Sequence, residues 1–245
     1  MSFNDIIDQQ DVVSILKEEL KDNRINHAYL FVGKAGIGKK TLALEFARAL
    51  LCQNSKNDSC GKCKNCRRIE HGNHPDVRLI AADDNSTSLK IDQIREMQKE
   101  IAYKPYESDY KVYIVDEAEQ MTNQAANSLL KTLEEPPDYA VIILITEELN
   151  KILPTVISRC QNIRFSSISQ DKVENYLYNN GIEKKKAEFL ARLAEGSIGR
   201  ALSLEEDEDF LDKRKSILDF LKNLLQVEKV AVFNKVAEMK SLLQE

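Results

Sequence analysis

The sequence predicts an α/β fold built on a five-stranded parallel sheet with helices on both faces. Short apolar runs alternate with amphipathic segments up to about residue 165, and this alternation is typical of parallel sheets that are covered on both sides. A glycine-rich segment directly follows the first of the apolar runs. After residue 165 only helical periodicity remains, so a smaller helical part is expected to follow the sheet.

The expected elements follow from the spacing of the apolar residues. Helical spacing marks amphipathic helices at 10–23, 41–51, 91–101 and 122–133. Short apolar runs predict strands at 28–32, 77–81, 111–115, 140–146 and 162–165. Further helices are expected at 171–178, 184–194, 200–204, 210–225 and 230–243. The acidic run from Glu205 to Asp209 lies between the helices expected at 200–204 and 210–225. It is expected to be an exposed junction, because like charges repel.

Length and composition indicate a globular protein with a packed core. The 245 residues suffice for one large domain with a small satellite, and 42% of them are hydrophobic and 31% charged. The expected parts are a sheet domain at 1–166, a three-helix domain at 167–205 and a short helical segment at 206–245. The net charge of −5 argues against a chain that coats nucleic acid by itself.

No segment of the sequence predicts export or a membrane span. The first residues lack the basic region and apolar run of a secretory signal, and the longest apolar stretch, Ala140–Ile145, is too short to cross a bilayer. We therefore expect a cytoplasmic protein with no membrane partner. In a reducing compartment, clustered cysteines bind metal more often than they form disulfides.

The glycine-rich segment has the pattern of a phosphate-binding loop. Gly33, Gly36 and Gly38 allow a tight turn that points backbone N–H groups at a polyphosphate, and Lys39 adds a positive charge near the outer phosphates. The position directly after a strand makes the pattern more specific than the residues alone. An accidental glycine turn is the alternative interpretation.

One residue of this loop departs from the pattern of nucleotide hydrolases. Lys40 stands where a Ser or Thr hydroxyl would ligate Mg²⁺, and an ammonium group repels that cation. Thr41 comes one residue late, which rotates its side chain by about 100° on a helix. The loop is expected to bind phosphate, with weak or absent binding of ATP or ADP and without a competent Mg²⁺ site.

Two carboxylates follow the strand expected at 111–115. Asp116 and Glu117 match the acids that hold Mg²⁺ and orient the attacking water in loop-containing ATPases. Their position is suitable because the carboxyl ends of parallel strands face the phosphate loop. A pair of helix-capping acids is the alternative. Because the Ser or Thr ligand of Mg²⁺ is missing, the two acids indicate a scaffold that is used for folding and assembly.

Four of the five cysteines fall within one segment, 52–66, which predicts a structural zinc module. The residues Cys52, Cys60, Cys63 and Cys66 supply four sulfur ligands, and Cys-x-x-Cys steps present two sulfurs on one side. A closed set of four ligands favours a structural over a catalytic ion.

Alternatives stay open for several residues near this module. Cys52 could be a buried helix residue, with His71 or His74 as the fourth ligand. The basic cluster, defined as Lys62, Lys64, Arg67 and Arg68, could contact phosphates or form a solvated surface. Cys160 stands apart from the others and is expected to be a core residue.

Taken together, these motifs resemble a bacterial replicative clamp loader, a member of the AAA+ class. The resemblance runs from about residue 5 to 204, and its most specific segments are 23–33, 52–66, 115–119, 125–137 and 153–161. Among clamp-loader subunits the chain looks like delta-prime. The ATPase motor, gamma/tau, keeps Ser or Thr at the position of Lys40 and opens with a basic segment, whereas this chain opens with Phe3-Asn-Asp-Ile-Ile. The segment 196–202 resembles the delta-prime version of the lid motif.

The resemblance implies an AAA+ domain with a zinc-binding insertion, a helical lid at 167–205 and a collar domain that is mostly absent. Residues 206–245 would be a reduced collar of two helices or a truncated third domain. The implied role is that of a stator without ATPase activity of its own, in a five-subunit ring with gamma/tau and delta. That ring belongs to the DNA polymerase III holoenzyme, a nucleotidyltransferase complex, and loads the sliding clamp onto primed DNA.

The resemblance also assigns roles to individual residues. Ser158 and Arg159 match a motif whose arginine acts in trans on ATP held by the neighbouring motor subunit. Thr146 matches the residue that senses the γ-phosphate, and Arg200 matches the lid arginine that approaches bound nucleotide. The alternatives are an ordinary ion-pair arginine at 159 and a surface residue at 200.

Two other functions compete with the stator. An active gamma/tau-type ATPase is disfavoured by Lys40, and a zinc-dependent DNA-binding module is disfavoured by the net charge of −5.

Overall fold

The computed structural model describes residues 2–82, 88–207, 214, 216–219 and 222. The helix expected at 230–243 lies outside the described residues, as does most of the helix expected at 210–225. The chain separates into two compact units, Met1–Ala201 and Leu202–Glu245. The domain boundaries expected after residues 166 and 205 stay predictions.

A five-stranded parallel sheet forms the centre of the first unit, as predicted. Its order is β2-β3-β4-β1-β5, and every neighbouring pair is parallel. The strands are β1 (Ala28–Val32), β2 (Val77–Ile80), β3 (Lys111–Val115), β4 (Ala140–Thr146) and β5 (Gln161–Arg164). Helical connections join each strand to the next strand in the sequence, as parallel strands require, so strands and helices alternate along the chain.

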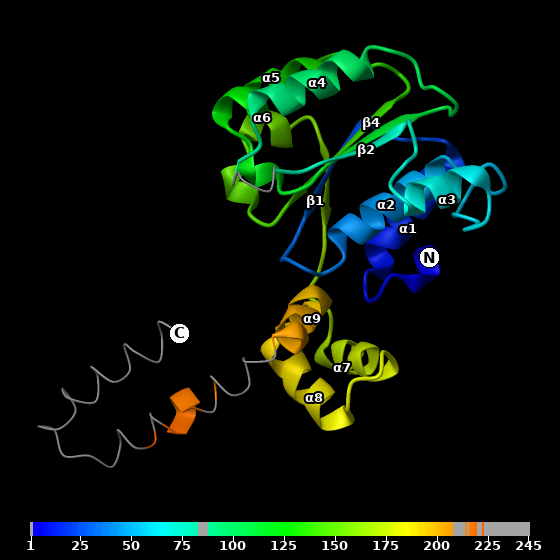
Figure 1. Cartoon of the computed structure of the whole chain (residues 1–245). Coiled ribbons are helices and arrows are strands. Elements are labelled where there is room, and N and C mark those ends of the chain that lie inside the picture. The colour runs from blue at the N-terminus through cyan, green and yellow to red at the C-terminus, as the bar shows by residue number, and fades with distance from the viewer. Residues whose placement is uncertain (1, 83–87, 208–213, 215, 220–221, 223–245) are drawn as a thin grey trace, which may run out of the picture. The chain divides into compact units, whose positions relative to one another are not determined.

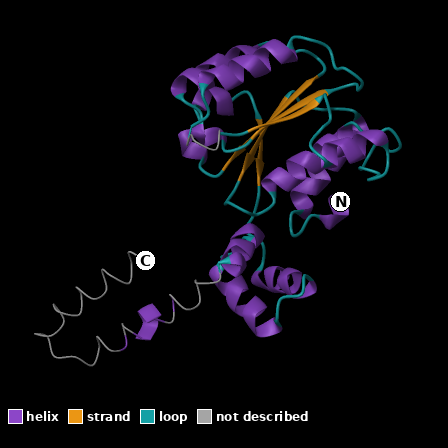
Figure 2. Cartoon of the chain, viewed as in Figure 1, coloured by secondary structure: helices purple, strands orange, loops and turns teal. Residues whose placement is uncertain are grey.

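The helices cover both faces of the sheet (Figures 1 and 2). Those on one side are α1 (Gln10–Asp22), α2 (Lys39–Leu50) and α3 (Lys64–Glu70), and those on the other are α4 (Ile91–Ile101), α5 (Asn123–Glu134) and α6 (Pro154–Ile157). Within residues 166–207, three helices follow the sheet: α7 (Gln170–Asn179), α8 (Lys184–Leu193) and α9 (Ile198–Glu206). Short 3₁₀ turns are η1 (Phe3–Asp5), η2 (Ala118–Gln120) and η3 (Leu149–Lys151).

Alternate residues of the central strands build two separate cores. Tyr29 and Phe31 of β1 pack with Phe46 of α2, whereas Leu30 joins the core of Ile94 and Leu129 from α4 and α5. This division follows from the two-residue repeat of a strand. The edge strands β2 and β5 are partly exposed, so the expectation of strands buried on both faces holds for the three central ones.

Two local differences from the expected elements have physical causes. Helix α2 begins at Lys39 instead of residue 41, because Gly38 takes a left-handed conformation with φ +98° and serves as its N-cap. Helix α3 begins inside the cysteine segment and was not expected. It begins where the Sγ of Cys63 accepts the N–H of Cys66, so the cysteines themselves define its start. In the described part of the chain, no helix is long and apolar enough to cross a membrane.

Candidate nucleotide site and metal centre

The phosphate loop begins where β1 ends, beside the end of β4. The N–H of Gly33 donates to the carbonyl oxygen of Thr146 at 3.1 Å. A Cβ at Gly33 would lie 2.5 Å from Cδ1 of Ile37 and 2.9 Å from Cβ of Phe165. Only glycine fits there, so the loop leaves the sheet in a single tightly packed direction.

The apex of the loop rests on the start of α9. Gly36 has φ +66°, and a Cβ there would lie 2.5 Å from Oγ of Ser197 and 2.8 Å from Cα of Gly199. The N–H of Gly199 donates to the carbonyl of Gly36 at 2.9 Å, and Oγ of Ser197 donates to the carbonyl of Ala35 at 2.7 Å. The start of α9 therefore covers the loop at Ala35 and Gly36.

Lys39 is buried inside the loop and bound to its backbone. Its Nζ donates to the carbonyls of Gly33 at 2.5 Å and Lys34 at 2.6 Å, and the residue is only 6% exposed. Burial lowers the pKa of Lys39, while the nearby carboxylates of Glu147 and other acids oppose the shift. Any phosphate group would have to compete with these two carbonyl oxygens for the ammonium.

Lys40 forms an ion pair with Asp116, one of the two acids considered for the magnesium site. Its Nζ lies 3.1 Å from Oδ2 of Asp116, whose side chain is 20% exposed, while Oδ1 of Asp116 accepts the N–H of Glu117 at 3.1 Å. Sequence reasoning predicted only a repulsion of Mg²⁺ by Lys40. In the structure, the ammonium of Lys40 also neutralises the carboxylate of Asp116. Both positions at which a Mg²⁺ ligand was considered are therefore altered. Thr41 is half-buried in the first turn of α2. It comes one residue after the position where a hydroxyl ligand for Mg²⁺ is expected, so it does not replace that ligand.

The other residues expected around a nucleotide have partners of their own. Thr146 is fully buried, and its Oγ1 accepts the N–H of Glu148 at 3.2 Å. Nη1 of Arg200 lies 3.4 Å from Oε2 of Glu195. Glu117 is exposed and has φ +48°, a conformation that costs about 1 kcal/mol or more for a residue with a side chain. The strained backbone at Glu117 is a feature that the sequence did not predict.

An open pocket of about 730 Å³ adjoins the start of the loop. The strand ends Val32, Gly33, Arg164 and Phe165 line one part of it, and residues 147–150, 152, 154 and 157 line the rest. It therefore lies at the carboxyl edge of the sheet, the edge where ligands bind in parallel α/β folds.

Arg159 lies between α6 and β5, with its guanidinium at the surface. Nη2 is 2.6 Å from Oε1 of Glu134 at the end of α5, and Nη1 donates to the carbonyl of Thr155 at 2.9 Å. One third of the side chain is exposed. The neighbouring Ser158 is exposed and its Oγ donates to the carbonyl of Thr155 at 3.1 Å. Cys160 is buried in the core, as predicted, and burial raises its pKa to about 12.

Arg159 and the phosphate loop belong to opposite edges of the sheet. Gln161, the first residue of β5, pairs with Tyr29 of β1, and the loop starts four residues further along at Gly33. At about 3.3 Å per residue, these levels are about 13 Å apart along the strands, and Arg159 precedes Gln161. This separation is longer than an arginine side chain, and Arg159 contacts Glu134 at the end of α5 instead of its own loop.

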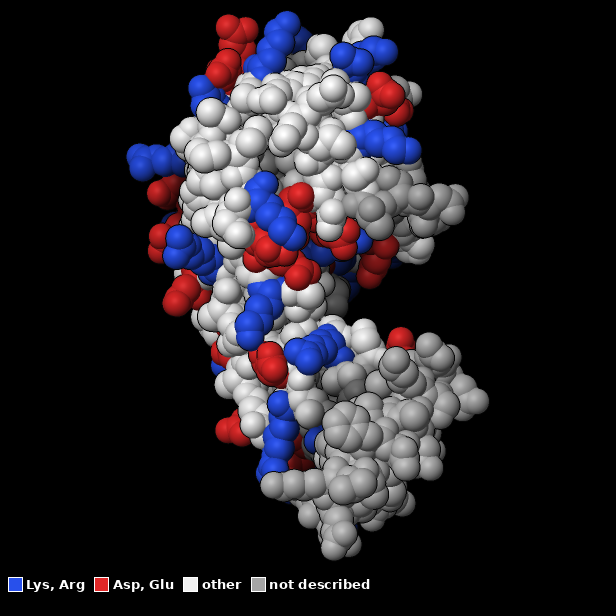
Figure 3. Space-filling view, turned by 90° about the vertical axis from the view of Figure 1, so that its left-hand side faces the viewer, with Lys and Arg blue, Asp and Glu red and all other residues white. Residues whose placement is uncertain are grey.

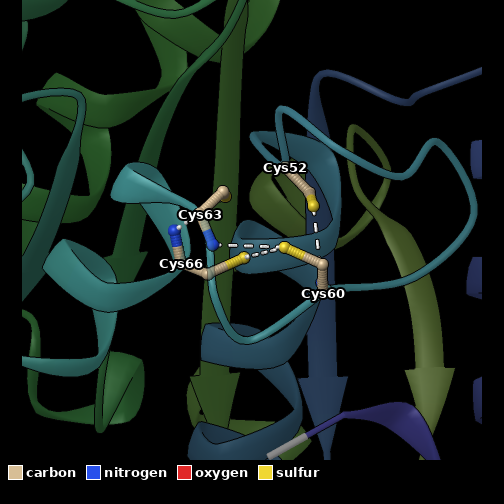
Figure 4. A group of neighbouring side chains, drawn as sticks. All are labelled: Cys52, Cys60, Cys63 and Cys66. Atoms are coloured by element: carbon tan, nitrogen blue, oxygen red, sulfur yellow. Dashed lines mark hydrogen bonds between the residues drawn. The ribbon is translucent and has the colours of Figure 1, made fainter.

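The four cysteines of segment 52–66 converge into one cluster. Their sulfur atoms all lie within 4.8 Å of one another. Figure 4 shows the sulfurs of Cys60 and Cys66 facing each other, 4.0 Å apart, with the sulfur of Cys52 beside them. Tetrahedral thiolate coordination with metal–sulfur bonds of about 2.3 Å requires sulfurs about 3.8 Å apart. The cluster therefore fits a four-coordinate metal ion.

Backbone N–H groups already point at the cysteine sulfurs. The N–H groups of Cys63, Cys66 and Cys60 lie 3.3–3.4 Å from the sulfurs of Cys60, Cys63 and Cys52 respectively. Backbone hydrogen bonds from Lys62 and Cys63 lower the pKa of Cys60 to about 6, whereas burial raises that of Cys66 to about 12. N–H donors stabilise thiolates, the form in which cysteine binds metal.

The histidines considered as a fourth ligand are engaged elsewhere. His71 is exposed and its Nδ1 lies 2.6 Å from the carbonyl of Arg67. His74 is buried, and its Nδ1 accepts the N–H of Asp76 at 3.1 Å. The structure instead brings Cys52 into the cluster.

Comparison with known proteins identifies the family. A family model described as DNA polymerase III, delta subunit, matches residues 8–169. DNA polymerase III subunit delta′ of Bacillus subtilis is 37% identical over 225 residues, which cover 92% of this chain and 68% of that protein. The chain belongs to the DNA polymerase III clamp-loader family. The predicted resemblance to delta-prime is thereby confirmed.

The gamma and tau members of this family are also close in sequence. The tau/gamma subunit of Haemophilus influenzae is 34% identical over 231 residues, which are 91% of this chain but 33% of that subunit. The chain thus spans about a third of the length of this relative. Overall identity alone does not separate delta-prime from gamma and tau, and the residues of the site have to do so.

Solved structures confirm the predicted AAA+ fold of this clamp-loader chain. The gamma subunit-related protein of Thermotoga maritima has a TM-score of 0.51 at 23% identity and covers 93% of this chain and 77% of its own. RuvB of the same organism has a TM-score of 0.55 at 15% identity, with coverage of 83% and 62%. At these identities the likeness concerns the fold alone.

One structural residue of the clamp-loader chain was missed by sequence reasoning. The carboxylate of Asp76 is fully buried and accepts the N–H groups of Tyr106, Glu107 and Ser108 at 2.5–3.1 Å. It fixes the loop before β3 beside the cysteine segment. A lone Asp after a proline gives no such signal in the sequence.

The same loop neutralises part of the basic cluster. Glu107 forms ion pairs with Lys64, at 2.7 Å, and with Arg68. On the left-hand face of Figure 1, away from α3, Figure 3 likewise shows Lys and Arg side chains interspersed with Asp and Glu. This pattern favours a mixed protein surface over a continuous phosphate-binding one.

Proposed function

We propose that this chain is the delta-prime subunit of the bacterial clamp loader, a stator that does not hydrolyse ATP. It supplies Arg159 in trans to ATP that is bound by the neighbouring gamma/tau motor subunit. Its partners are the gamma/tau and delta subunits of a hetero-pentamer, and through them the sliding clamp and primed DNA.

The position of Arg159 is the observation that carries this proposal. Its guanidinium is at the surface, at the sheet edge opposite to the phosphate loop of the same chain. A cation that cannot reach its own loop is suited to act on a ligand of a neighbour. Its flanks are well fixed, because Cys160 is in the core and Ser158 bonds to the carbonyl of Thr155.

The role of Arg159 would be electrostatic. Its N–H groups would donate to oxygens of the γ-phosphate and stabilise the negative charge that develops there in the transition state. To do so, the guanidinium must leave the carboxylate of Glu134, 2.6 Å away. Such half-exposed ion pairs contribute about 1 kcal/mol or less, so a triphosphate of higher charge can displace Glu134.

The contacts in the phosphate loop of this chain support a nucleotide site that does not hydrolyse ATP. Lys40 occupies Asp116, and Lys39 is bound by two carbonyls of the loop. Both contacts oppose a complex of Mg²⁺ with ATP, so ATP or ADP would bind weakly or not at all. This disfavours the alternative of an active gamma/tau-type motor.

We propose that the cysteine cluster holds Zn²⁺ in a structural role. Four sulfurs within 4.8 Å of one another match its preference for thiolates in a tetrahedron. The ion would join the end of α2 to α3. A zinc-dependent DNA-binding module is disfavoured by the pairing of Lys64 and Arg68 with Glu107.

Reconstitution with purified motor and delta subunits tests the proposed function. With the sliding clamp and primed DNA present, we expect clamp-stimulated ATPase activity to rise when this chain completes the assembly. Assembly is measured in parallel by size-exclusion chromatography. If a complete complex forms without any gain in ATPase activity or clamp loading, the stator proposal is wrong.

A further inference from the structure

A buried arginine lies next to the cysteine cluster. Arg48 is in the last turn of α2, four residues before Cys52, and is only 3% exposed. Arginine is almost never fully buried unless its charge is paired.

The protein partners of Arg48 satisfy only part of its guanidinium. Nη1 donates to Oε1 of Glu45 at 2.5 Å, and the other oxygen of Glu45 accepts the hydroxyl of Ser59 at 3.1 Å. Nε and Nη2 are buried without a hydrogen-bond partner among the described residues. A second carboxylate, that of Glu70, lies 3.9 Å from Nη2 and is half-exposed.

The unsatisfied side of the guanidinium lies against the turn that carries the cysteines. Nη2 is 3.8 Å from the position that a Cβ would take on Gly61, the residue between Cys60 and Lys62. The backbone carbonyl of Arg48 lies 4.0 Å from the sulfur of Cys66. Both ends of Arg48 therefore adjoin the metal-binding segment, the backbone at Cys66 and the guanidinium at the Cys60–Cys63 turn.

A cluster with a bound metal ion would supply the negative charge and the hydrogen-bond acceptors that the guanidinium of Arg48 lacks. Four thiolates and one divalent ion carry a net charge of −2, and two of the four ligands, Cys63 and Cys66, are buried while Cys52 and Cys60 are partly exposed. Buried anionic groups need a counter-charge or hydrogen-bond donors. The amide of Asn54, 3.7 Å from the sulfur of Cys60, and three backbone N–H groups already provide donors, but these groups are neutral.

We propose that Arg48 is a positioning residue for the metal, whose buried charge and free N–H groups stabilise the four-thiolate cluster. Groups outside the ligand set commonly change metal affinity 10–100-fold. Because Arg48 lies on α2, the helix that starts at the phosphate loop, it also ties the metal module to the core. The inference rests on the proposed metal site and does not depend on the stator role.

The experiment uses the full chain and four variants. Arg48→Met removes the charge and the donors but keeps the length, and Arg48→Lys keeps the charge alone. Glu45→Gln removes the known partner, and the Glu45→Gln/Arg48→Met double variant removes the buried ion pair as a whole, a change that proteins often tolerate. Zinc affinity is measured by competition with a chromogenic chelator. Co²⁺ titration reports the sulfur-to-metal charge-transfer bands.

We expect Arg48→Met to weaken zinc binding at least 10-fold and to shift the Co²⁺ charge-transfer bands, with partial rescue in Arg48→Lys. Glu45→Gln should bind zinc at least as tightly as the wild type. In the double variant the loss of affinity should persist. Wild-type affinity in Arg48→Met, or full recovery in the double variant, would show that Arg48 serves only Glu45. If Arg48→Met does not fold, the double variant alone decides between these outcomes.

Discussion

Replacing Arg159 with alanine is expected to lower ATP turnover at the neighbouring motor site by about 10³-fold or more, while this chain stays folded. Arginine fingers contribute about this much to phosphoryl transfer because they stabilise charge that is present only in the transition state. Stability should change by no more than about 1 kcal/mol, since the pair with Glu134 is half-exposed.

The measurement needs a complex in which only the motor subunit next to this chain keeps its loop lysine, so that other sites do not mask the loss. Arg192→Ala is a matched control, because Arg192 is an exposed arginine in α8 with a carboxylate partner, Glu188, at 2.5 Å. Equal turnover in the Arg159→Ala and Arg192→Ala complexes would remove the basis for a role in trans.

Loss of the metal ion is expected to be the largest effect on stability. Chelation, or Cys66→Ser, should release the ion and lower the free energy of unfolding by an amount on the order of 5 kcal/mol, because binding of a structural ion is coupled to folding. For a chain of this size, Tm would then fall by roughly 10–20 °C. Metal content by mass spectrometry under native conditions and calorimetric Tm check the two effects together.

Cys160→Ala provides the comparison for this prediction. Cys160 is a buried cysteine outside the cluster, so the variant should keep one ion per chain and lose only the small packing contribution of a sulfur atom. A Cys66→Ser protein that retains the ion with wild-type Tm would contradict the structural role of the cluster.

The sequence could predict the sheet and the convergence of the four cysteines because both depend on local pattern. The apolar run of β4, Ala140–Thr146, is buried throughout, as a central strand between two layers must be. The spacing of the four cysteines places two sulfurs on one turn, and the structure brings the fourth, Cys52, to within the same 4.8 Å. The predictions agree with the structure at both places because few folds are compatible with such an apolar run or with such a spacing of cysteines.

The interactions that define the site chemically could not be read in this way. The pairing of Lys40 with Asp116 joins residues 76 positions apart, and the loop that Asp76 fixes lies 30 positions away. The sequence shows that Lys40 is an unsuitable magnesium ligand, but it does not show that the ammonium finds a carboxylate. Similarly, Arg48 looks like an ordinary surface residue of α2, and only its burial reveals a role.

Turnover of Mg²⁺–ATP by the isolated chain tests the central claim most directly. We predict no hydrolysis above background for the wild-type chain, and no further loss in Lys39→Ala. Lys40→Thr, which frees Asp116 and restores a hydroxyl ligand, should increase Mg²⁺-dependent nucleotide binding. Robust hydrolysis by the wild-type chain that disappears in Lys39→Ala would contradict the account and identify the chain as a motor subunit.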